Sequence, residues 1–324
     1  MSSQTSRSGV HCMYDWHSEY GDLLHGRVVM VTGAAGFVGS HLCEALTELG
    51  AVVCGLTRTT PTGRLVRANE ILAVDICDEA ALCAAVDRIR PDIIYHLAGF
   101  VNAGQSMSLV GPTLRDNLLG TINVLQAAAN GCGRLILTGS SEEPTAMTNQ
   151  IPTSPYAASK AAGSMYGRMF NSLYDLPVVI ARAFMSYGPR QDPTKFIPYT
   201  ILALLRGENP QLASGERICD LVYIKDLIRG LLCASSSDDL IGRTVDIGTG
   251  HSTRLRDVAE ALVELTASTG SPVFGAIPER RFEAPSIANT DNHNLLGNWR
   301  PLWSLQDGLI ATVQWYRHHR NRFP

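Results

Sequence analysis

The sequence predicts an α/β fold: a Rossmann-type, doubly wound parallel sheet with a smaller, discontinuous C-terminal lobe that binds substrate. Two observations predict it. An apolar run at 28–31 leads directly into a glycine-rich turn with the spacing GxxGxxG, and such a run is typical of a central parallel strand buried on both faces. Beyond it, strand-like segments alternate with helical segments of about a dozen residues, which favours parallel crossover connections over hairpins.

The glycine turn is the first candidate for a binding site. Gly33 permits the tight turn, Gly36 lets backbone amides approach a pyrophosphate, and Gly39 lets the following helix pack against the strand. The amides at the start of that helix, at Phe37 and Val38, and the helix dipole favour an anionic phosphate. The turn therefore predicts a dinucleotide site, although a turn without a ligand can have the same spacing.

The other strands and helices of the sheet follow in order. Strands are predicted at 51–56, 71–74, 92–98, 134–138 and 178–183, and helices at 37–49, 79–90, 113–130 and 155–175. Because the carboxyl ends of parallel strands meet at one edge of a sheet, where ligands bind, the residues at these ends should lie together. They are Gly33, Thr57, Asp75, Gly99 and Ser140.

The C-terminal part supplies the second lobe. Helices are predicted at 196–206, at 253–266 after a Ser252/Thr253 cap, and at 305–318, while 220–234 and 243–248 return to the sheet edge. The predicted domain organisation is an N-terminal extension at 1–26, a dinucleotide-binding domain at 27–183 with returning segments near 220–250, and a substrate-binding lobe at 184–219 and 251–324.

Composition argues against several classes of function. The 324 residues are 45% apolar, enough for a buried core, and a net charge of -3 gives no field that would gather nucleic acid or an anionic membrane. The eight cysteines include no CxxC pair, which favours reduced thiols in a cytoplasmic protein over disulfides or a zinc site. No stretch approaches the roughly 20 apolar residues of a membrane helix. We therefore expect a small-molecule partner, no nucleic acid, no membrane and no metal; a metal site at His11, Cys12 and His17 is the weaker alternative to an extension packed on the surface.

The end of the second strand bears on the choice of cofactor. NAD-binding folds usually carry Asp or Glu there for the adenosine ribose, whereas this chain has Thr57 and Arg58. A hydroxyl beside a guanidinium suits a 2′-phosphate, so NADP(H) is the preferred cofactor. NAD(H) stays possible, because Arg58 could equally be a solvated loop residue.

Two segments carry candidate catalytic groups: TGSSEE at 138–143 and SPYAASK at 154–160. Tyr156 and Lys160 lie four residues apart and share one face of the predicted helix. An ammonium group beside a phenol should lower the tyrosine pKa, so that the phenol exchanges a proton near neutral pH. Ser140 can hydrogen-bond the same substrate oxygen. An isolated YxxxK pattern would more simply indicate an amphipathic helix.

The motifs TGAAGFVG, HLAG, DNLLGTINVLQAA, TGSSEE, YAASK and YGPRQ together resemble those of the extended short-chain dehydrogenase/reductase family, whose members modify nucleotide sugars. The resemblance runs from about residue 27 to the end and implies an NAD(P)-dependent enzyme. It assigns Tyr156 as the acid/base, Lys160 as its partner and ligand of the nicotinamide ribose, and Ser140 as the donor to the substrate oxygen. Its implied cofactor contacts are Gly33, Gly36 and Gly39 at the pyrophosphate, Asp75 and Ile76 at the adenine, and Leu97, Ala98 and Gly99 beside the nicotinamide, with Asn117 as a structural asparagine.

Within that family, SSEE and the GLTR at 55–58 look closest to reductases that convert GDP-4-keto-6-deoxymannose to GDP-rhamnose. This resemblance predicts NADPH-dependent reduction of the 4-keto group of a nucleotide-activated 4-keto-6-deoxyhexose. Glu142 keeps a second class open, because family dehydratases and decarboxylases use a glutamate at this place as a general acid/base. The alternative is an NAD-dependent 4-epimerase, 4,6-dehydratase or decarboxylase that recycles its cofactor, and a non-enzymatic nucleotide sensor is the weakest interpretation.

Three departures from the family pattern concern the sugar nucleotide. The loop from Glu143 to Tyr156 is short, which suggests an open sugar site, Met185 replaces a diphosphate-binding asparagine, and Cys219 replaces a phosphate-binding arginine. Arginine can bind phosphate through two donors at once, so Arg217 could substitute, and Arg280 matches another family arginine near the nucleotide. A sugar carrier other than the common nucleotide diphosphates, or an altered pose, stays open. The predicted substrate contacts are Ser140, Ser141, Met185, Arg217 and Arg280. By analogy with the family, the helices at 113–130 and 155–175 should form a four-helix contact in a homodimer.

Overall fold

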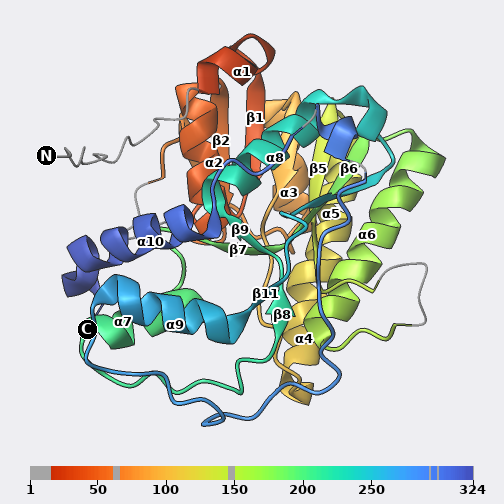
Figure 1. Ribbon diagram of the computed structural model, residues 1–324. Coiled ribbons are helices and arrows are strands. Elements are labelled where there is room, and N and C mark those ends of the chain that lie inside the picture. Colours follow the sequence, from red (N-terminus) through yellow and green to blue (C-terminus); the bar gives the residue numbers. More distant parts are fainter. Residues whose placement is uncertain (1–15, 61–65, 145–149, 292, 298, 324) are drawn as a thin grey trace, which may run out of the picture.

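A seven-stranded parallel sheet forms the centre of the computed structural model (Figure 1), which describes residues 16–60, 66–144, 150–291, 293–297 and 299–323. Its strand order, β10-β6-β5-β4-β1-β2-β3, confirms the predicted doubly wound sheet. Thr32 at the end of β1 pairs with Leu56 and His96 of the two flanking strands, so these strands end level at one edge. The strands are β1 (Val28–Thr32), β2 (Val52–Thr57), β3 (Glu70–Ala73), β4 (Ile93–His96), β5 (Arg134–Ser140), β6 (Val178–Ala183) and β10 (Thr244–Ile247).

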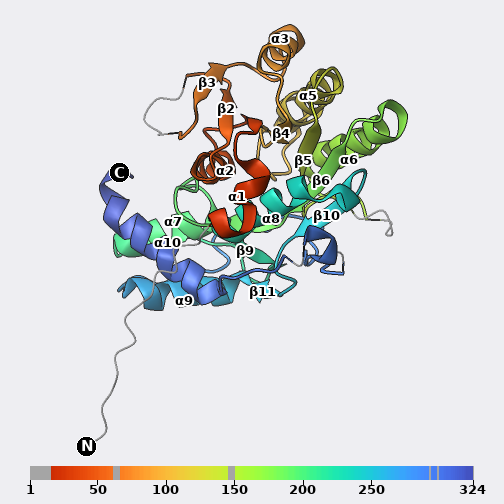
Figure 2. The same cartoon turned by 90° about the horizontal axis from the view of Figure 1, so that it is seen from above.

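Helices cover both faces of the sheet, as Figure 2 shows from above. One face carries α3 (Glu79–Ile89), α5 (Gly120–Ala129) and α6 (Pro155–Tyr174), and the other carries α2 (Phe37–Glu48) and α8 (Ile224–Ser236). Local signals set two of the starts. The Asp78 side chain caps α3 at the Ala81 amide, and the Ser154 side chain caps α6 at the Ala157 amide, with Pro155 in the first turn.

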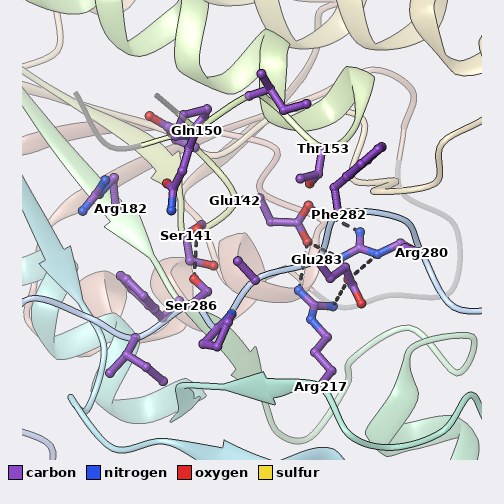
Figure 3. Close-up of a pocket in the computed structure, with 17 residues that line it drawn as sticks. Ser141, Glu142, Gln150, Thr153, Arg182, Arg217, Arg280, Phe282, Glu283 and Ser286 are labelled. Carbon is purple, nitrogen blue, oxygen red and sulfur yellow. Dashed lines mark hydrogen bonds and ion pairs between the residues drawn. The ribbon is translucent and has the colours of Figure 1, made fainter. Parts of the chain in front are cut away.

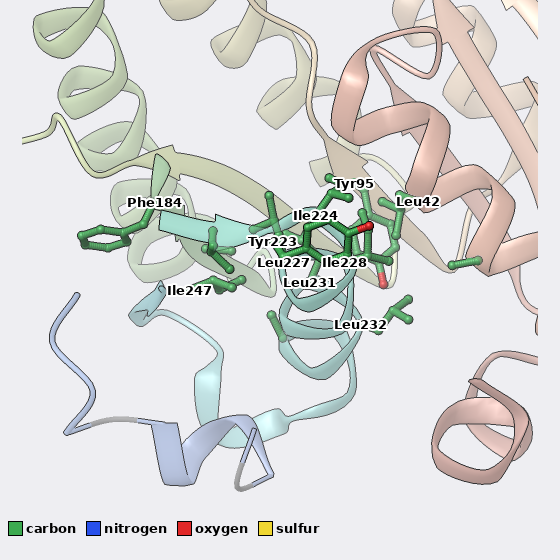
Figure 4. Packing of buried hydrophobic residues seen from close by; sticks show 14 of the residues in the cluster. Leu42, Tyr95, Phe184, Tyr223, Ile224, Leu227, Ile228, Leu231, Leu232 and Ile247 are labelled. Atoms are coloured by element: carbon green, nitrogen blue, oxygen red, sulfur yellow. The ribbon is translucent and has the colours of Figure 1, made fainter. Parts of the chain in front are cut away.

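Helix α8 fills the centre of the larger hydrophobic cluster (Figure 4). The segment 220–234, predicted to return to the sheet edge, forms β9 (Leu221–Tyr223), which pairs with β7 (Met185–Tyr187), and then α8, which packs on β5, β6 and β10. The apolar residues of this segment recur at helical spacing, which buries one stripe of a helix rather than the face of a strand. The cluster around α8 includes Ile224, Leu227, Ile228, Leu231, Leu232, Leu42, Tyr95, Phe184, Tyr223 and Ile247.

The helix predicted at 113–130 is present, but it begins at Val110 and contains a π-helical stretch. The chain forms α4 (Val110–Thr113), a π-helical stretch at Leu114–Leu119, and then α5. A π-helical turn in such a place is often found at functional sites. Both Asp116 and Asn117 are buried in this stretch, and each contacts groups at the edge where the strands end, as described below.

The C-terminal lobe gathers at one end of the sheet, away from α1 (Figure 1). It contains α7 (Phe196–Leu205), α9 (Leu255–Thr266) and α10 (Leu305–His319). Helix α9 begins two residues later than predicted, because Thr253–Arg254 form β11, which pairs with β8 (Ile218–Cys219) instead of capping the helix. Short 3₁₀ helices complete the described elements: Met107–Leu109, Asp238–Leu240, His293–Leu296 and Arg320–Arg322.

Part of the predicted N-terminal extension is a helix, α1 (Trp16–Leu24), docked on the fold. Tyr20 and Leu24 are buried in the core cluster, and the Tyr20 hydroxyl lies 3.1 Å from the Cys233 sulfur of α8. His11 and Cys12, two members of the alternative metal site, lie outside the described residues. In the part of the chain that the structure describes, no three His, Cys, Asp or Glu side chains are grouped to hold a metal ion.

None of the helices in the described ranges combines the length and apolar character that crossing a bilayer requires.

Candidate active site

The glycine turn between β1 and α2 packs backbone against backbone. Gly33 has a φ of +71°, and a Cβ there would lie 2.8 Å from the amide nitrogen of Ala98. A Cβ on Gly39 would lie 2.2 Å from the carbonyl oxygen of Gly33. Only glycine permits these approaches. The turn therefore holds the start of α2 directly against the loop that follows β4.

The start of α2 suits an anionic group. Gly36 is the N-cap residue and gives the helix amides no side-chain hydrogen bond. The first amides of a helix have no acceptor within the helix, so those at Phe37 and Val38 are suited to an anionic ligand that the helix dipole also favours. These residues fit the pyrophosphate of a dinucleotide, at the place that the glycine spacing predicted.

A buried hydrogen-bond chain fixes the loop after β4, where the nicotinamide half was predicted. Thr32 Oγ1 accepts from the amides of Leu97 and Ala98, at 3.2 and 3.1 Å, and lies 2.8 Å from His96 Nδ1. Burial lowers the pKa of His96 to about 3, so its ring is neutral. Thr32 Oγ1 already accepts two hydrogen bonds, so its own hydroxyl donates to His96 Nδ1. The other ring nitrogen, His96 Nε2, therefore carries the proton and donates to Thr121 Oγ1 at 3.0 Å. The chain defines one tautomer and one position for this loop.

Asn117, in the π-helical stretch, joins this loop to the helix that carries Tyr156. Its side-chain oxygen accepts from the Phe100 amide at 2.6 Å, and its nitrogen donates to the Phe100 carbonyl and to Ser159 Oγ, both at 3.1 Å. The Asn117 carbonyl accepts from Thr121, which extends the chain from His96. Gly99 lies so close that a Cβ would be 2.7 Å from the Asn117 oxygen. Asn117 thus has the structural role that the family resemblance implied.

Four charged groups meet at the ends of β2 and β3, where the adenosine was predicted. Arg58 Nη2 lies 2.5 Å from Asp116 Oδ2, and Arg58 Nε lies 4.0 Å from Asp75 Oδ2. Arg115 contacts the same two carboxylates at 2.6 and 2.8 Å. The side chain of Asp116 is only 6% exposed. Arg58 is therefore a paired cation, although its side chain is 56% exposed. Sequence reasoning missed Asp116 and Arg115 because nothing local marks them.

The remaining adenosine candidates are held by local bonds. Thr57 is buried at the end of β2, and its hydroxyl lies 3.5 Å from the Leu72 carbonyl. Burial opposes a charged Asp75, but hydrogen bonds from the Cys77 amide and the Arg115 guanidinium outweigh it and lower the pKa of Asp75. Ile76 packs its side chain into the second core cluster. Asp75 therefore stays ionised and fixed at this edge.

Ser140 and Tyr156 meet as predicted, and Lys160 takes a different partner. Ser140 ends β5, Tyr156 lies in the first turn of α6, and their side chains hydrogen-bond to each other. Lys160 Nζ donates to the carbonyl oxygen of Thr138 on β5. The arrangement places the phenol and the serine hydroxyl together at the carboxyl edge of the sheet.

The prediction that Lys160 lowers the pKa of Tyr156 is wrong for the protein by itself. Burial raises the pKa of Tyr156 to about 12; the hydrogen bond with Ser140 opposes this shift, and the carboxylates of Glu142 and Glu143 add to it. Burial also lowers the pKa of Lys160, against the attraction of Glu143. Desolvation therefore outweighs the local charges, and the phenol is protonated at neutral pH until another positive charge reaches it.

The two glutamates of SSEE, Glu142 and Glu143, make different contacts. Glu143 is buried and its Oε1 accepts from the Ser140 amide at 2.6 Å, which closes the turn after β5. The Glu142 amide donates to Ser140 Oγ at 3.2 Å, while the Glu142 side chain lines a cavity of about 360 Å³. Glu143 thus supports the turn, and Glu142 presents its carboxylate to the cavity.

Inside the cavity, Glu142 is paired with both predicted phosphate-binding arginines (Figure 3). Its Oε1 lies 3.0 Å from Arg280 Nη2 and 3.2 Å from Arg217 Nη2. Glu283 contacts the same two guanidinium groups, 2.5 Å from Arg280 Nε and 3.2 Å from Arg217 Nη1. The network has two positive and two negative groups. Sequence reasoning missed Glu283, because 280–283 is not helical and the i,i+3 spacing indicates a contact only on a helix.

The other predicted substrate residues divide into two groups. Ser141 lines the cavity, and its carbonyl accepts from Ser286 Oγ at 2.9 Å. Met185 is not among the described residues that line it; the Met185 amide instead donates to the Asp220 carbonyl as β7 begins. The short loop predicted to open the sugar site lies partly outside the described residues, at 145–149. Cavity residues that were not predicted include Gln150, Thr153, Arg182, Phe184, Phe282 and Glu283.

Comparisons with known proteins identify the family of this chain. The model of the "NAD dependent epimerase/dehydratase family" matches residues 29–248. The dTDP-glucose 4,6-dehydratase of Neisseria gonorrhoeae is 28% identical over 91% of this chain and 96% of its own length. A UDP-glucose 4-epimerase of Thermotoga maritima, solved with UDP-glucose, superposes with a TM-score of 0.82 at 28% identity, covering 90% of this chain and 99% of that one.

A third similar protein, the dTDP-glucose 4,6-dehydratase of Streptomyces venezuelae, was solved with NAD bound. It has a TM-score of 0.78 at 28% identity, over 91% of this chain and 98% of that one. The family model covers more than half of the sequence, and the matched segment contains the glycine turn, Ser140, Tyr156 and Lys160. The chain therefore belongs to the NAD-dependent epimerase/dehydratase family, a group of enzymes within the extended short-chain dehydrogenases/reductases.

Proposed function

We propose that the protein is an NAD-dependent enzyme that oxidises the C4 hydroxyl of a nucleotide-activated hexose and later returns the hydride to the same sugar. The observation that carries the proposal is the meeting of Ser140 and Tyr156 at the sheet edge, between the glycine turn and a cavity with two arginines. Relatives of both internal-redox types, 4-epimerases and 4,6-dehydratases, support it.

The proposed roles of the side chains follow from their contacts. When bound, NAD supplies a hydride acceptor and a positive nicotinamide ring. A positive charge near Tyr156 would favour the phenolate and overcome the burial that raises the tyrosine pKa to about 12. Tyr156 then takes the proton of the sugar hydroxyl, and Ser140 hydrogen-bonds the same oxygen. Arg217 and Arg280 bind the diphosphate.

The pairing of Arg58 supports NAD over NADP(H). A 2′-phosphate carries two negative charges, and beside Arg58 it would also meet the carboxylates of Asp116 and Asp75, which already pair with that guanidinium. The hydroxyls of an unphosphorylated ribose meet no such repulsion. NADP(H) remains the alternative, and it would accompany the reduction of a 4-keto-6-deoxyhexose that the SSEE and GLTR motifs predicted.

Glu142 favours a second candidate, 4,6-dehydration. Its carboxylate lies in the cavity and close enough to Tyr156 to raise the tyrosine pKa. Once C4 is a ketone, the C5 proton is acidic. Glu142 would accept that proton and pass it to the departing C6 hydroxyl, which leaves as water, so that a C5–C6 double bond forms with no net change in electrons. The later return of hydride to C6 and a proton to C5 would complete the 6-deoxy sugar.

The first experiment identifies the nucleotide that the purified protein releases on denaturation. We expect close to one NAD per chain, because an enzyme that recycles its cofactor has no need to release it. The emptied protein should then bind NAD more tightly than NADPH. An empty site that prefers NADPH would instead support the reductase, and assays with 4-keto-6-deoxy nucleotide sugars would follow.

We also propose a homodimer formed through the outer surfaces of α4, the π-helical stretch and α6. Large apolar side chains are exposed there, and they would be covered by the same surface of a second copy. Light scattering should give a dimer, and Met165→Asp should give a monomer, whereas Leu302→Asp, at an equally exposed site on the C-terminal lobe, should not. A monomeric wild type would reject this interface. The exposed residues are Val110, Leu114, Leu119, Met165, Tyr166, Leu173 and Tyr174.

Two features support the proposed organisation and location. Arg217 and Arg280 reach one cavity from two separate segments, which supports a discontinuous substrate-binding lobe at 184–219 and 251–324. The described cysteines form no disulfide, which is compatible with the reducing environment of the cytoplasm.

A further inference from the structure

The donors of the cavity arginines are largely taken up by protein groups. Arg280 donates from Nε to Glu283, from Nη1 to the Ala103 carbonyl at 2.8 Å, and from Nη2 to Glu142. Arg217 reaches Glu142 with one terminal nitrogen and Glu283 with the other. Its Nε is a buried donor for which no described residue provides an acceptor. The pair of arginines is therefore neutralised, with one donor still unsatisfied.

A diphosphate cannot use these arginines while both carboxylates stay in place. Its two negative charges would add to those of Glu142 and Glu283 around two guanidinium groups, and like charges at this separation repel strongly in a partly buried site. One carboxylate has to leave. Both carboxylates lie 3.2 Å from Arg217, but toward Arg280 the contacts of Glu142 are the longer ones, at 3.0 and 3.4 Å, whereas Glu283 lies 2.5 Å from Arg280 Nε. Glu142 is the group that is easier to displace.

Displacement would change what Glu142 can do. In the network, Oε1 accepts from Arg217 and Arg280, and Oε2 accepts a third bond from Arg280. A carboxylate with both oxygens engaged in charge-assisted bonds has few lone pairs free for a proton from substrate. Its backbone amide is held by Ser140 Oγ, so a released side chain would swing about a fixed point next to Ser140 and Tyr156.

We propose that the nucleoside diphosphate of the substrate displaces Glu142 from Arg217 and Arg280, so that the carboxylate becomes available to the sugar only when the diphosphate is bound. This inference rests on the proposed action on nucleotide sugars. It makes Glu142 a competitor of the substrate anion in the empty cavity and a proton acceptor in the filled one. The arginines then couple binding at the diphosphate to chemistry at the hexose.

The test measures the affinity of the NAD-loaded protein for UDP, dTDP and GDP, which lack the sugar, by calorimetry. Glu142→Gln removes the competing charge and should tighten binding of whichever nucleotide the wild type prefers by about tenfold, while kcat with the sugar nucleotide falls. Glu279→Gln is the matched control, because Glu279 is exposed, adjacent to Arg280 in sequence, and bonded to Ser214 rather than to an arginine. It should change neither value.

Equal or weaker nucleotide binding by Glu142→Gln would overturn the inference and leave the proposed function in place. If no nucleoside diphosphate binds to the wild type or to either variant while NAD is retained, the proposed substrate class itself fails. Thermal unfolding and NAD content report whether Glu142→Gln is folded. If it is not, Glu142→Ala serves in its place with the same expectation.

Discussion

Replacing Tyr156 by phenylalanine should lower kcat by about 10²- to 10⁴-fold, the usual contribution of a positioned acid/base. The change removes one hydroxyl, the group that hydrogen-bonds Ser140 at the sheet edge, and leaves the ring in place. The dissociation constants for NAD and for the nucleotide should stay within about threefold, since neither depends on that proton. Steady-state kinetics with a nucleotide hexose and calorimetry on the same preparation measure both quantities.

Tyr199→Phe is the matched control for this prediction. It also removes one hydroxyl, which accepts a bond from the Gln211 amide on the C-terminal lobe, and it should keep wild-type kcat. A Tyr156→Phe protein with more than half of the wild-type kcat would show that the phenol moves no proton in the rate-limiting step. If its biological activity were also unchanged, the nucleotide-sensor interpretation would become the stronger one.

Gly39→Ala should abolish stoichiometric retention of NAD and weaken NAD binding by at least about tenfold. The new Cβ would lie 2.2 Å from the Gly33 carbonyl oxygen, and a backbone atom cannot rotate away as a side chain can. Helix α2 must shift off the turn, which displaces the amides that face the pyrophosphate. Forcing an extra carbon into a packed site costs about 1–3 kcal/mol of unfolding free energy, so the melting temperature should fall too.

Gly111→Ala makes the same chemical change without the contact. A Cβ at Gly111 in α4 meets no atom within 4 Å, and alanine is the better helix former by up to about 1 kcal/mol. This variant should bind NAD normally and be at least as stable as the wild type. If Gly39→Ala also kept its NAD, the close packing of the turn would not be what positions the cofactor.

The sheet could be predicted because its signals are local. Each strand of the doubly wound sheet is a short apolar run beside a turn or a helix, and most predicted bounds agree with the structure to within one or two residues. The π-helical stretch within 113–130 could not be predicted in this way. Asp116 and Asn117 lie in this stretch between α4 and α5, and their partners, Arg58 and Ser159, are distant in sequence.

The site was predicted less completely, because the partners of its charged side chains are distant in sequence. Arg58 pairs with a carboxylate 58 positions away, and Glu142 pairs with arginines 75 and 138 positions away. A motif places a side chain on an element, but it does not show which opposite charge the fold brings to it. The pKa of Tyr156 has the same origin, since the burial that raises it comes from the whole fold.

The position of β10 has a consequence for how the chain is made. Strand β6 precedes the first part of the C-terminal lobe, yet its outer partner β10 comes only after that part and α8, with Ile180 opposite Thr244. Until Ile247 has emerged from the ribosome, the Val-Val-Ile run of β6 lies at an open edge with unpaired amides and carbonyls, a template on which another nascent chain can add a strand. A product that stops before β10 would keep this aggregation-prone edge, so the emergence of β10 both closes the sheet and protects the unfinished protein from its neighbours.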